Sequence, residues 1–155
     1  MGNRKSPVQY NRMNHYHLIY TPKTLGDLLI DSLPYARFCA SEEVGQGGRH
    51  YHIYIETDVS EDTVRDRLKR CQLIPQGARG RKSLYYSCRP VEPHPAEFPD
   101  QDLRKFTLGY TLKNQTIEPN DSTTFRGGYT NQELIEAQKY YQDTNFAAKR
   151  RQEQL

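Results

Sequence analysis

The chain has 155 residues, of which 35% are hydrophobic and 26% are charged, and its net charge at pH 7 is +3. This length supports one domain with a substantial core, and the small net charge alone does not indicate a nucleic-acid-binding protein. No apolar run has membrane-spanning length, the first ten residues lack the apolar core of a secretory signal, and the three cysteines form no CxxC pair. We therefore expect an intracellular protein with reduced thiols, not a membrane protein, a zinc domain or a disulfide framework.

The first half of the chain predicts a strand, a helix and then two strands joined by a turn. Alternation over 15–21 is typical of a strand. Leucines at helical spacing indicate a short helix over 24–33. Residues 35–43 and 49–57 are strand-like, and the glycines of the segment 44–48 between them predict a hairpin turn.

The second half begins with a helix capped by Ser60, whose expected inner face carries Val64, Leu68 and Cys71. A capping box formed by Thr130 and Glu133 marks the start of the last helix. After the helix capped by Ser60, we expect a basic loop at 78–82, a strand over 83–91 and a proline-rich connection over 92–100. A helix over 101–114 and a loop over 118–128 follow, and the final helix runs to about Ala148.

The order of the first six elements is β-α-β-β-α-β, which predicts an α+β, ferredoxin-like (RRM-like) domain with a central antiparallel sheet. Two further helices follow this core. We expect residues 1–149 to form the single domain and residues 150–155 to be a basic tail.

The tripeptide His-Tyr-His occurs twice, and its second copy predicts a metal site. His50 and His52 alternate with apolar residues on a strand, so both imidazoles lie on the same face. Glu42 and Glu43 lie across the glycine turn, where a partner strand would bring a carboxylate near them. Two imidazoles and one carboxylate form an incomplete shell that leaves room for water or a phosphate oxygen.

The first copy, with His15 and His17, has no acidic residue on its flanking strand positions. We interpret these two histidines as polar strand residues or DNA contacts.

Tyr110 and Lys113 are three residues apart on an expected helix, with Phe106 one turn earlier, so they share one face. A tyrosine hydroxyl is a poor nucleophile at its ordinary pKa near 10. A neighbouring ammonium group and a metal-polarised phosphate would both favour the phenolate.

Taken in order, these motifs resemble the nicking domain of the HUH endonucleases, most closely the Rep proteins of eukaryotic circular single-stranded DNA viruses. The aromatic-Thr pair of the family's first motif is matched by Tyr20-Thr21, the second motif by His50-Tyr51-His52, and the third, YxxK, by Tyr110 to Lys113. The resemblance covers roughly residues 12–115.

The resemblance implies that His50 and His52 bind a divalent ion, Mg²⁺ or Mn²⁺. The glutamate that precedes this histidine pair by about eight residues in the family corresponds to Glu42, which we expect to be the third ligand. Strand parity instead puts Glu43 on the more polar face, so Glu43 remains the alternative.

The activity implied by the resemblance is sequence-specific nicking of single-stranded DNA at a stem-loop origin of rolling-circle replication. Tyr110 attacks the scissile phosphate to form a 5′-phosphotyrosine link, Lys113 assists, and a free 3′-hydroxyl later rejoins the ends. The residues expected to contact DNA are Tyr20, Thr21, Arg79, Arg81 and Lys82.

The resemblance further implies a location in the host nucleus, a monomeric isolated domain and a helicase domain after the basic tail. The chain has no GxxxxGK[ST] loop, so we expect no nucleotide cofactor. The main alternative is a non-catalytic ferredoxin-like module that binds single-stranded nucleic acid through strand aromatics, namely Tyr51, Tyr54, Tyr85 and Tyr86. A relaxase or transposase of the same chemistry is a nearer alternative, which the short domain and the YxxK spacing disfavour.

Overall fold

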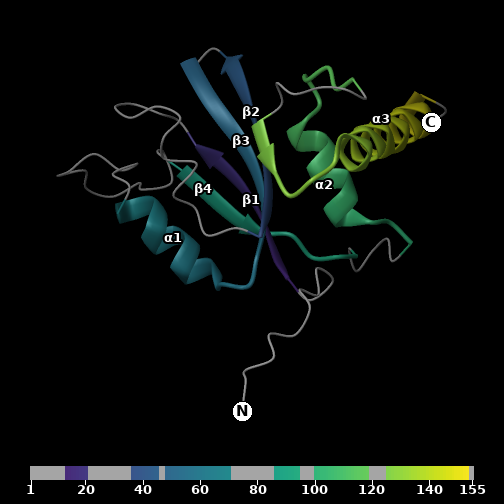
Figure 1. The fold of residues 1–155 in the computed structure, drawn as a ribbon. Coiled ribbons are helices and arrows are strands. Elements are labelled where there is room, and N and C mark those ends of the chain that lie inside the picture. The colour runs from purple at the N-terminus through teal and green to yellow at the C-terminus, as the bar shows by residue number, and fades with distance from the viewer. Residues whose placement is uncertain are drawn as a thin grey trace.

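The computed structural model describes residues 13–20, 36–45, 48–70, 86–94, 100–118 and 125–153. These residues form an α+β domain with a five-stranded antiparallel sheet and three helices (Figure 1). The strands are β1 (Asn14–Tyr20), β2 (Arg37–Gly45), β3 (Gly48–Thr57), β4 (Tyr86–Pro90) and β5 (Phe125–Gly127), and the helices are α1 (Glu61–Arg70), α2 (Leu103–Thr111) and α3 (Asn131–Glu153). None of the helices in these ranges is long and apolar enough to cross a membrane.

The strands lie in the order β4-β1-β3-β2-β5. β2 and β3 form a hairpin whose register runs without interruption from Gly45 opposite Gly48 to Arg37 opposite Glu56. The two strands therefore extend further into the glycine segment than the sequence predicts. β1 lies between β3 and β4, so the two His-Tyr-His stretches occupy neighbouring strands.

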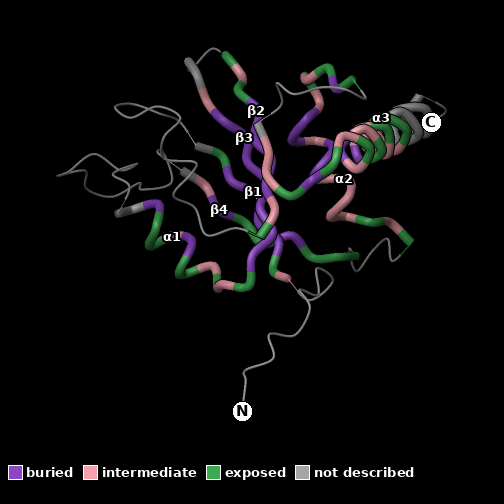
Figure 2. Tube along the Cα trace, viewed as in Figure 1, coloured by how far each residue is buried: buried purple, intermediate pink, exposed green. Residues whose placement is uncertain are grey.

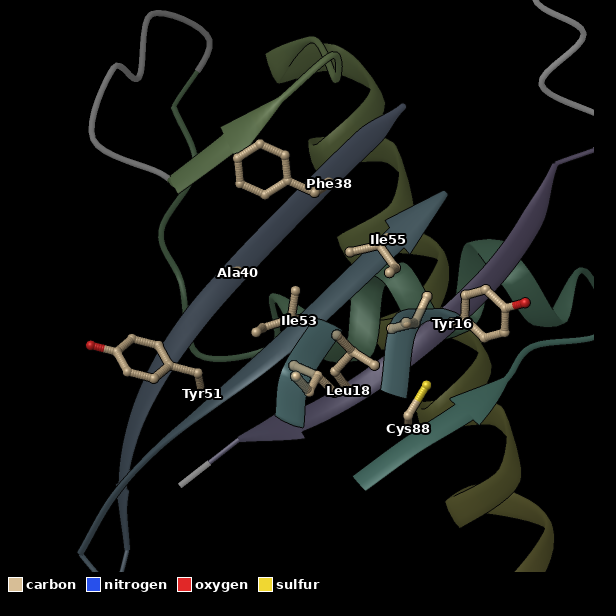
Figure 3. Close-up of a cluster of buried hydrophobic side chains, with 10 residues drawn as sticks. Tyr16, Leu18, Phe38, Ala40, Tyr51, Ile53, Ile55 and Cys88 are labelled. Carbon is tan, nitrogen blue, oxygen red and sulfur yellow. The ribbon is translucent and has the colours of Figure 1, made fainter. Parts of the chain in front are cut away.

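Buried residues run along the strands of the sheet (Figure 2). Their apolar side chains form one cluster on each face. On one face, β1 to β4 pack against α1 through a cluster that Figure 3 draws as sticks; its members are Tyr16, Leu18, Phe38, Ala40, Tyr51, Ile53, Ile55, Val64, Leu68 and Cys88. On the other face, α2 and α3 cover a second cluster of Cys39, Tyr54, Val91, Leu108, Leu112, Ile117, Tyr129, Leu134 and Ala137. The sheet is thus the middle layer of three, with its two faces distinguished by strand parity.

The two helix caps expected at Ser60 and at Thr130 are confirmed. Ser60 Oγ accepts a hydrogen bond from the Thr63 backbone N–H at 3.3 Å. Thr130 and Glu133 form a reciprocal capping box, in which each backbone N–H donates to the other side chain at 3.1 Å. The last helix runs to Glu153, beyond its expected end near Ala148, so four residues of the predicted tail region, 150–153, are helical.

One expectation is wrong: the segment expected to be a loop at 118–128 contains β5. This three-residue strand pairs with β2 at the edge of the sheet, with Gly127 opposite Phe38. A Cβ on Gly127 would lie 2.4 Å from the Phe38 ring, so the glycine leaves room for that ring beside β5. A three-residue strand that includes a glycine is too short to show the apolar–polar alternation from which a strand is predicted. The expected helix at 24–33, the basic loop at 78–82 and Cys71 lie outside the described residues.

A second glycine, Gly109, sets the distance between α2 and α3. A Cβ built at this position would lie 2.1 Å from the Ala137 carbonyl oxygen and 2.7 Å from Tyr141 Cβ. Both obstacles are fixed to the backbone of α3, so the side chain of an alanine could be accommodated only by moving one helix away from the other. The close approach of these helices therefore requires glycine here.

We expect Gly109→Ala to lower the free energy of unfolding by about 1–3 kcal/mol, the usual range for overpacking a core. Helix propensity alone predicts the opposite sign, because alanine is favoured over glycine by roughly 1 kcal/mol in a helix. Urea denaturation of the two proteins measures the difference. A gain in stability would show that the helices tolerate a methyl group at this contact.

Candidate metal centre

Glu43, His50 and His52 converge on the sheet face that α2 covers. Glu43 lies directly opposite His50 in the hairpin register, and His52 follows on the same face of β3. Glu43 Oε2 lies 3.1 Å from His50 Nε2 and 3.2 Å from His52 Nε2. The potential ligand atoms of the three side chains all lie within 4.8 Å of one another, which suits a single cation held by one carboxylate oxygen and two imidazole nitrogens.

The preference for Glu42 is corrected by this geometry. Glu42 is paired with Tyr51 and lies on the opposite face of the hairpin, where the Tyr51 hydroxyl donates to Glu42 Oε2 at 3.3 Å. The register contains no bulge that could bring it round to the histidines. Parity along the strand therefore agrees with the geometry in making Glu43 the candidate ligand, whereas the spacing of the resembled family does not.

His17 from the first His-Tyr-His stretch also reaches this cluster. Its Nε2 lies 3.2 Å from His52 Nδ1, and the two ring planes are inclined by only 14°. His17 sits opposite Tyr54 in the register, so it is the diagonal neighbour of His52 on the same face. His15 lies on the same sheet face as His17 but has different neighbours: its Nδ1 lies 2.6 Å from the Tyr54 hydroxyl, and its Nε2 lies beside Glu56.

Tyr110 and Lys113 approach the same cluster from the end of α2. The Tyr110 ring meets the rings of His17 and His52 nearly edge-on, with centroid distances of 5.8 Å and 5.6 Å. Lys113 Nζ lies 3.6 Å from Glu43 Oε1 and 3.9 Å from the centroid of the Tyr110 ring. Lys113 follows the C-cap residue of α2, so it stands just beyond the helix and connects the carboxylate to the phenol.

Asn114 was not expected at the site. Its Nδ2 donates to Glu43 Oε1 at 3.0 Å, beside Lys113. The opposite oxygen, Oε2, is the one that faces both imidazoles. The carboxylate is therefore oriented with one oxygen toward the histidines and one toward the chain after α2. An asparagine just after a helix is common, and no sequence pattern distinguishes this one.

Contacts from two other elements fix the end of α2. The Ser41 hydroxyl of β2 donates to the Thr111 carbonyl. From α3, Gln138 Nε2 donates to the Leu112 carbonyl at 2.8 Å, and Tyr141 packs against Tyr110 with a centroid distance of 5.7 Å. The position of Tyr110 thus depends on both the sheet and α3.

The electrostatics favour an ionised Glu43 carboxylate and hold the pKa of His52 below its usual value. Burial raises the pKa of Glu43, but the charges of His52 and Lys113 and the hydrogen bond from His50 outweigh it and leave the pKa below its usual value. Burial lowers the pKa of His52. The Glu43 carboxylate raises this pKa and the charge of Lys113 lowers it, so the net pKa lies below its usual value. Burial lowers the pKa of Lys113. The hydrogen bond and the charge interaction with Tyr110 raise it by more, so the net pKa lies above its usual value.

His17 gives a prediction for the pH dependence of stability in the metal-free protein. Burial, followed by His52, Lys113 and Arg89, lowers its pKa from 6.5 to about 4. The unfolded chain takes up this proton near pH 6.5 and the folded chain only near pH 4, so the stabilising contribution is complete above pH 6.5 and is lost as the pH falls toward 4. A lowering of the His17 pKa from 6.5 to about 4 corresponds to roughly 3–4 kcal/mol.

Urea denaturation of the metal-free protein at pH 7 and pH 4.5 measures this loss. Because carboxylates also titrate in that range, the matched comparison is His17→Gln, which lacks the titrating ring. We expect the stability of this variant to fall less between the two pH values. Equal losses in both proteins would assign the pH dependence to other groups.

The residues expected to contact DNA are mostly outside the described ranges. Tyr20 is the last residue of β1, where its backbone pairs with Tyr51 and Tyr86. Thr21, Arg79, Arg81 and Lys82 lie outside these ranges. Comparisons of the chain with protein-family models, with curated proteins and with solved structures find no match. The geometry of the site is therefore the basis for its interpretation.

Proposed function

We propose that this domain is a metal-dependent, single-tyrosine endonuclease of the HUH type that nicks and rejoins single-stranded DNA. One observation carries the proposal: the candidate nucleophile, the lysine and the three candidate ligands converge although they come from separate parts of the chain. Lys113 makes the link, because its ammonium group lies beside both Glu43 and Tyr110. Two separately predicted motifs, the second His-Tyr-His stretch and YxxK, thus lie in one cluster with Glu43.

The donor set fits a divalent cation. Glu43 would supply a carboxylate oxygen, and His50 and His52 would supply imidazole nitrogens, as inferred from their mutual distances. Carboxylates suit Mg²⁺ and Mn²⁺, whereas imidazoles suit ions further along the transition series, so we favour Mn²⁺ of the two. Once bound, such an ion would offset the charge of a phosphate at the site.

The remaining chemistry belongs to the side chains. Tyr110 would lose its phenolic proton and form a bond from its oxygen to phosphorus, while the bond from phosphorus to the 3′-oxygen breaks and that oxygen takes up a proton. The products are a 5′-phosphotyrosine link and a free 3′-hydroxyl. Lys113 would stabilise the developing phenolate, as its contact with the Tyr110 ring supports. The reverse reaction rejoins the ends.

The sheet supports a ferredoxin-like core as the scaffold. The order β4-β1-β3-β2 places the first and third strands at the centre, as expected for β-α-β-β-α-β connectivity, and β5 adds to the β2 edge. In this proposal the substrate is the stem-loop origin of a circular viral genome, replicated by the rolling-circle mechanism in the host nucleus.

The alternative hypothesis is a module that binds bases through strand aromatics, and two of the four tyrosines that it requires are buried. Tyr51 and Tyr54 are 5% and 1% exposed, so neither offers a ring face on which a base can stack. The side chains of Tyr85 and Tyr86 lie outside the described part of the chain. The burial of two central aromatics therefore favours the catalytic reading.

The proposal is tested by incubating the protein with single-stranded oligonucleotides of randomised sequence and Mn²⁺, followed by a denaturing gel. We expect a covalent protein–DNA band that EDTA abolishes, with the DNA attached to Tyr110 when the adduct is digested and analysed by mass spectrometry. DNA binding with no adduct under any metal condition would overturn the endonuclease and favour the binding module.

A further inference from the structure

His52 is the candidate ligand whose two ring nitrogens both face a defined neighbour. Its Nε2 is directed to Glu43, at 3.2 Å, and its Nδ1 is directed to His17 Nε2, also at 3.2 Å. The His52 side chain is only 6% exposed, compared with 26% for His50. The orientation of His52 is therefore set inside the protein, and His17 is the partner on the side away from Glu43.

The contact between His17 and His52 has the geometry of a hydrogen bond in the plane of the rings. The two planes are inclined by 14°, the centroids are 5.4 Å apart, and the two facing nitrogens are 3.2 Å apart. A hydrogen shared between those nitrogens lies close to both ring planes, along the lone-pair direction of the acceptor. The rings thus meet edge to edge.

Cation binding determines which nitrogen donates. A neutral imidazole carries one hydrogen, and the nitrogen that binds a cation must present its lone pair. If His52 binds through Nε2, which faces Glu43 and His50, its hydrogen must be on Nδ1 and must point at His17. His17 Nε2 then accepts, and the hydrogen of His17 resides on its own Nδ1.

We propose that His17 is a positioning residue of the metal centre: it accepts a hydrogen bond from His52 Nδ1 and so holds His52 Nε2 toward the cation without binding the cation itself. This inference rests on the proposed metal site but not on DNA cleavage. It gives the first His-Tyr-His stretch a role that the sequence did not predict. Partners of this kind commonly change metal affinity by roughly 10–100-fold.

The test is Mn²⁺ affinity, measured by calorimetry on the whole chain, for two variants of His17. His17→Phe keeps a flat ring but removes the acceptor, and we expect 10–100-fold weaker binding. His17→Gln places a carbonyl oxygen near the position of Nε2, and we expect affinity within about threefold of the original protein. His15→Gln, on the same strand but facing Tyr54 and Glu56, is the matched control and should not change Mn²⁺ affinity.

A spectroscopic readout separates positioning from packing, and its deciding result comes from the unmodified protein. In the unmodified protein loaded with Mg²⁺, nitrogen NMR should show the His52 hydrogen on Nδ1 and protected from exchange. In His17→Phe this protection should be lost, with circular dichroism confirming that the variant is folded. A His52 hydrogen on Nε2 in the loaded protein would overturn the proposal.

The remaining outcomes are distinct. Unchanged Mn²⁺ affinity in His17→Phe overturns the role of His17 but leaves the metal centre intact. The positioning role of His17 is also overturned if His17→Gln loses Mn²⁺ binding as completely as His52→Ala does, because His17 would then act as a ligand. If the unmodified protein binds no Mn²⁺, the metal centre itself fails, and this inference fails with it.

Discussion

Replacing Tyr110 by phenylalanine is expected to abolish the covalent DNA adduct, reducing its rate of formation by roughly 10³-fold or more, as for other lost nucleophiles. The substitution removes one oxygen and keeps the ring, so the edge-on contacts with His17 and His52 should persist. Mn²⁺ affinity and stability should change little, because no candidate ligand is altered. Quantitative denaturing gels with labelled oligonucleotides measure the adduct.

Tyr141 provides the matched control. It lies on α3, packs against both Phe106 and Tyr110, and loses the same single oxygen in Tyr141→Phe. We expect this variant to keep forming the adduct. If instead Tyr110→Phe reacts normally and Tyr141→Phe does not, the nucleophile is Tyr141 and the assignment of the YxxK motif is wrong.

The second large effect is expected for Glu43→Gln, which should weaken Mn²⁺ binding on the order of 100-fold or more. A lost ligand should cost at least as much as a lost supporting hydrogen bond, whose typical cost is roughly 10–100-fold. Glutamine preserves the size of the side chain but removes the negative charge that faces His50, His52 and Lys113. Calorimetric titration with Mn²⁺ measures the loss.

Glu42→Gln is the control for this prediction, because it makes the same chemical change one residue earlier. Its side chain lies on the opposite face of the hairpin beside Tyr51, so Mn²⁺ affinity should be nearly unchanged. The reverse result, with Glu42→Gln impaired and Glu43→Gln normal, would mean that the hairpin register in solution differs by one residue.

Much of the site could be predicted from the sequence because its signals are local. Alternation along one strand places His50 and His52 on one face, and the same two-residue period across a glycine turn favours Glu43. Family spacing pointed to Glu42 because a residue count takes no account of the face on which a strand residue lies. Tyr110 and Lys113 were predictable as a pair, since neighbours one helical turn apart converge.

The remaining features depend on contacts between distant segments. The role of His17 requires the register of β1 against β3, which no local pattern of either strand specifies. Asn114 reaches Glu43 only because α2 is fixed by Ser41 and α3. β5 was missed because three residues at a sheet edge are too few to show a period.

The three candidate ligands belong to one hairpin, from Glu43 to His52, whereas Tyr110 arrives from a helix more than fifty residues later in the chain. Contacts close in sequence form at a low cost in loop-closure entropy, while docking of α2 must wait for long-range contacts. The cation site can therefore assemble early in folding, before the nucleophile is in place. A divalent ion present during synthesis would then link β2 to β3 and assist folding, in addition to the catalytic role proposed for it.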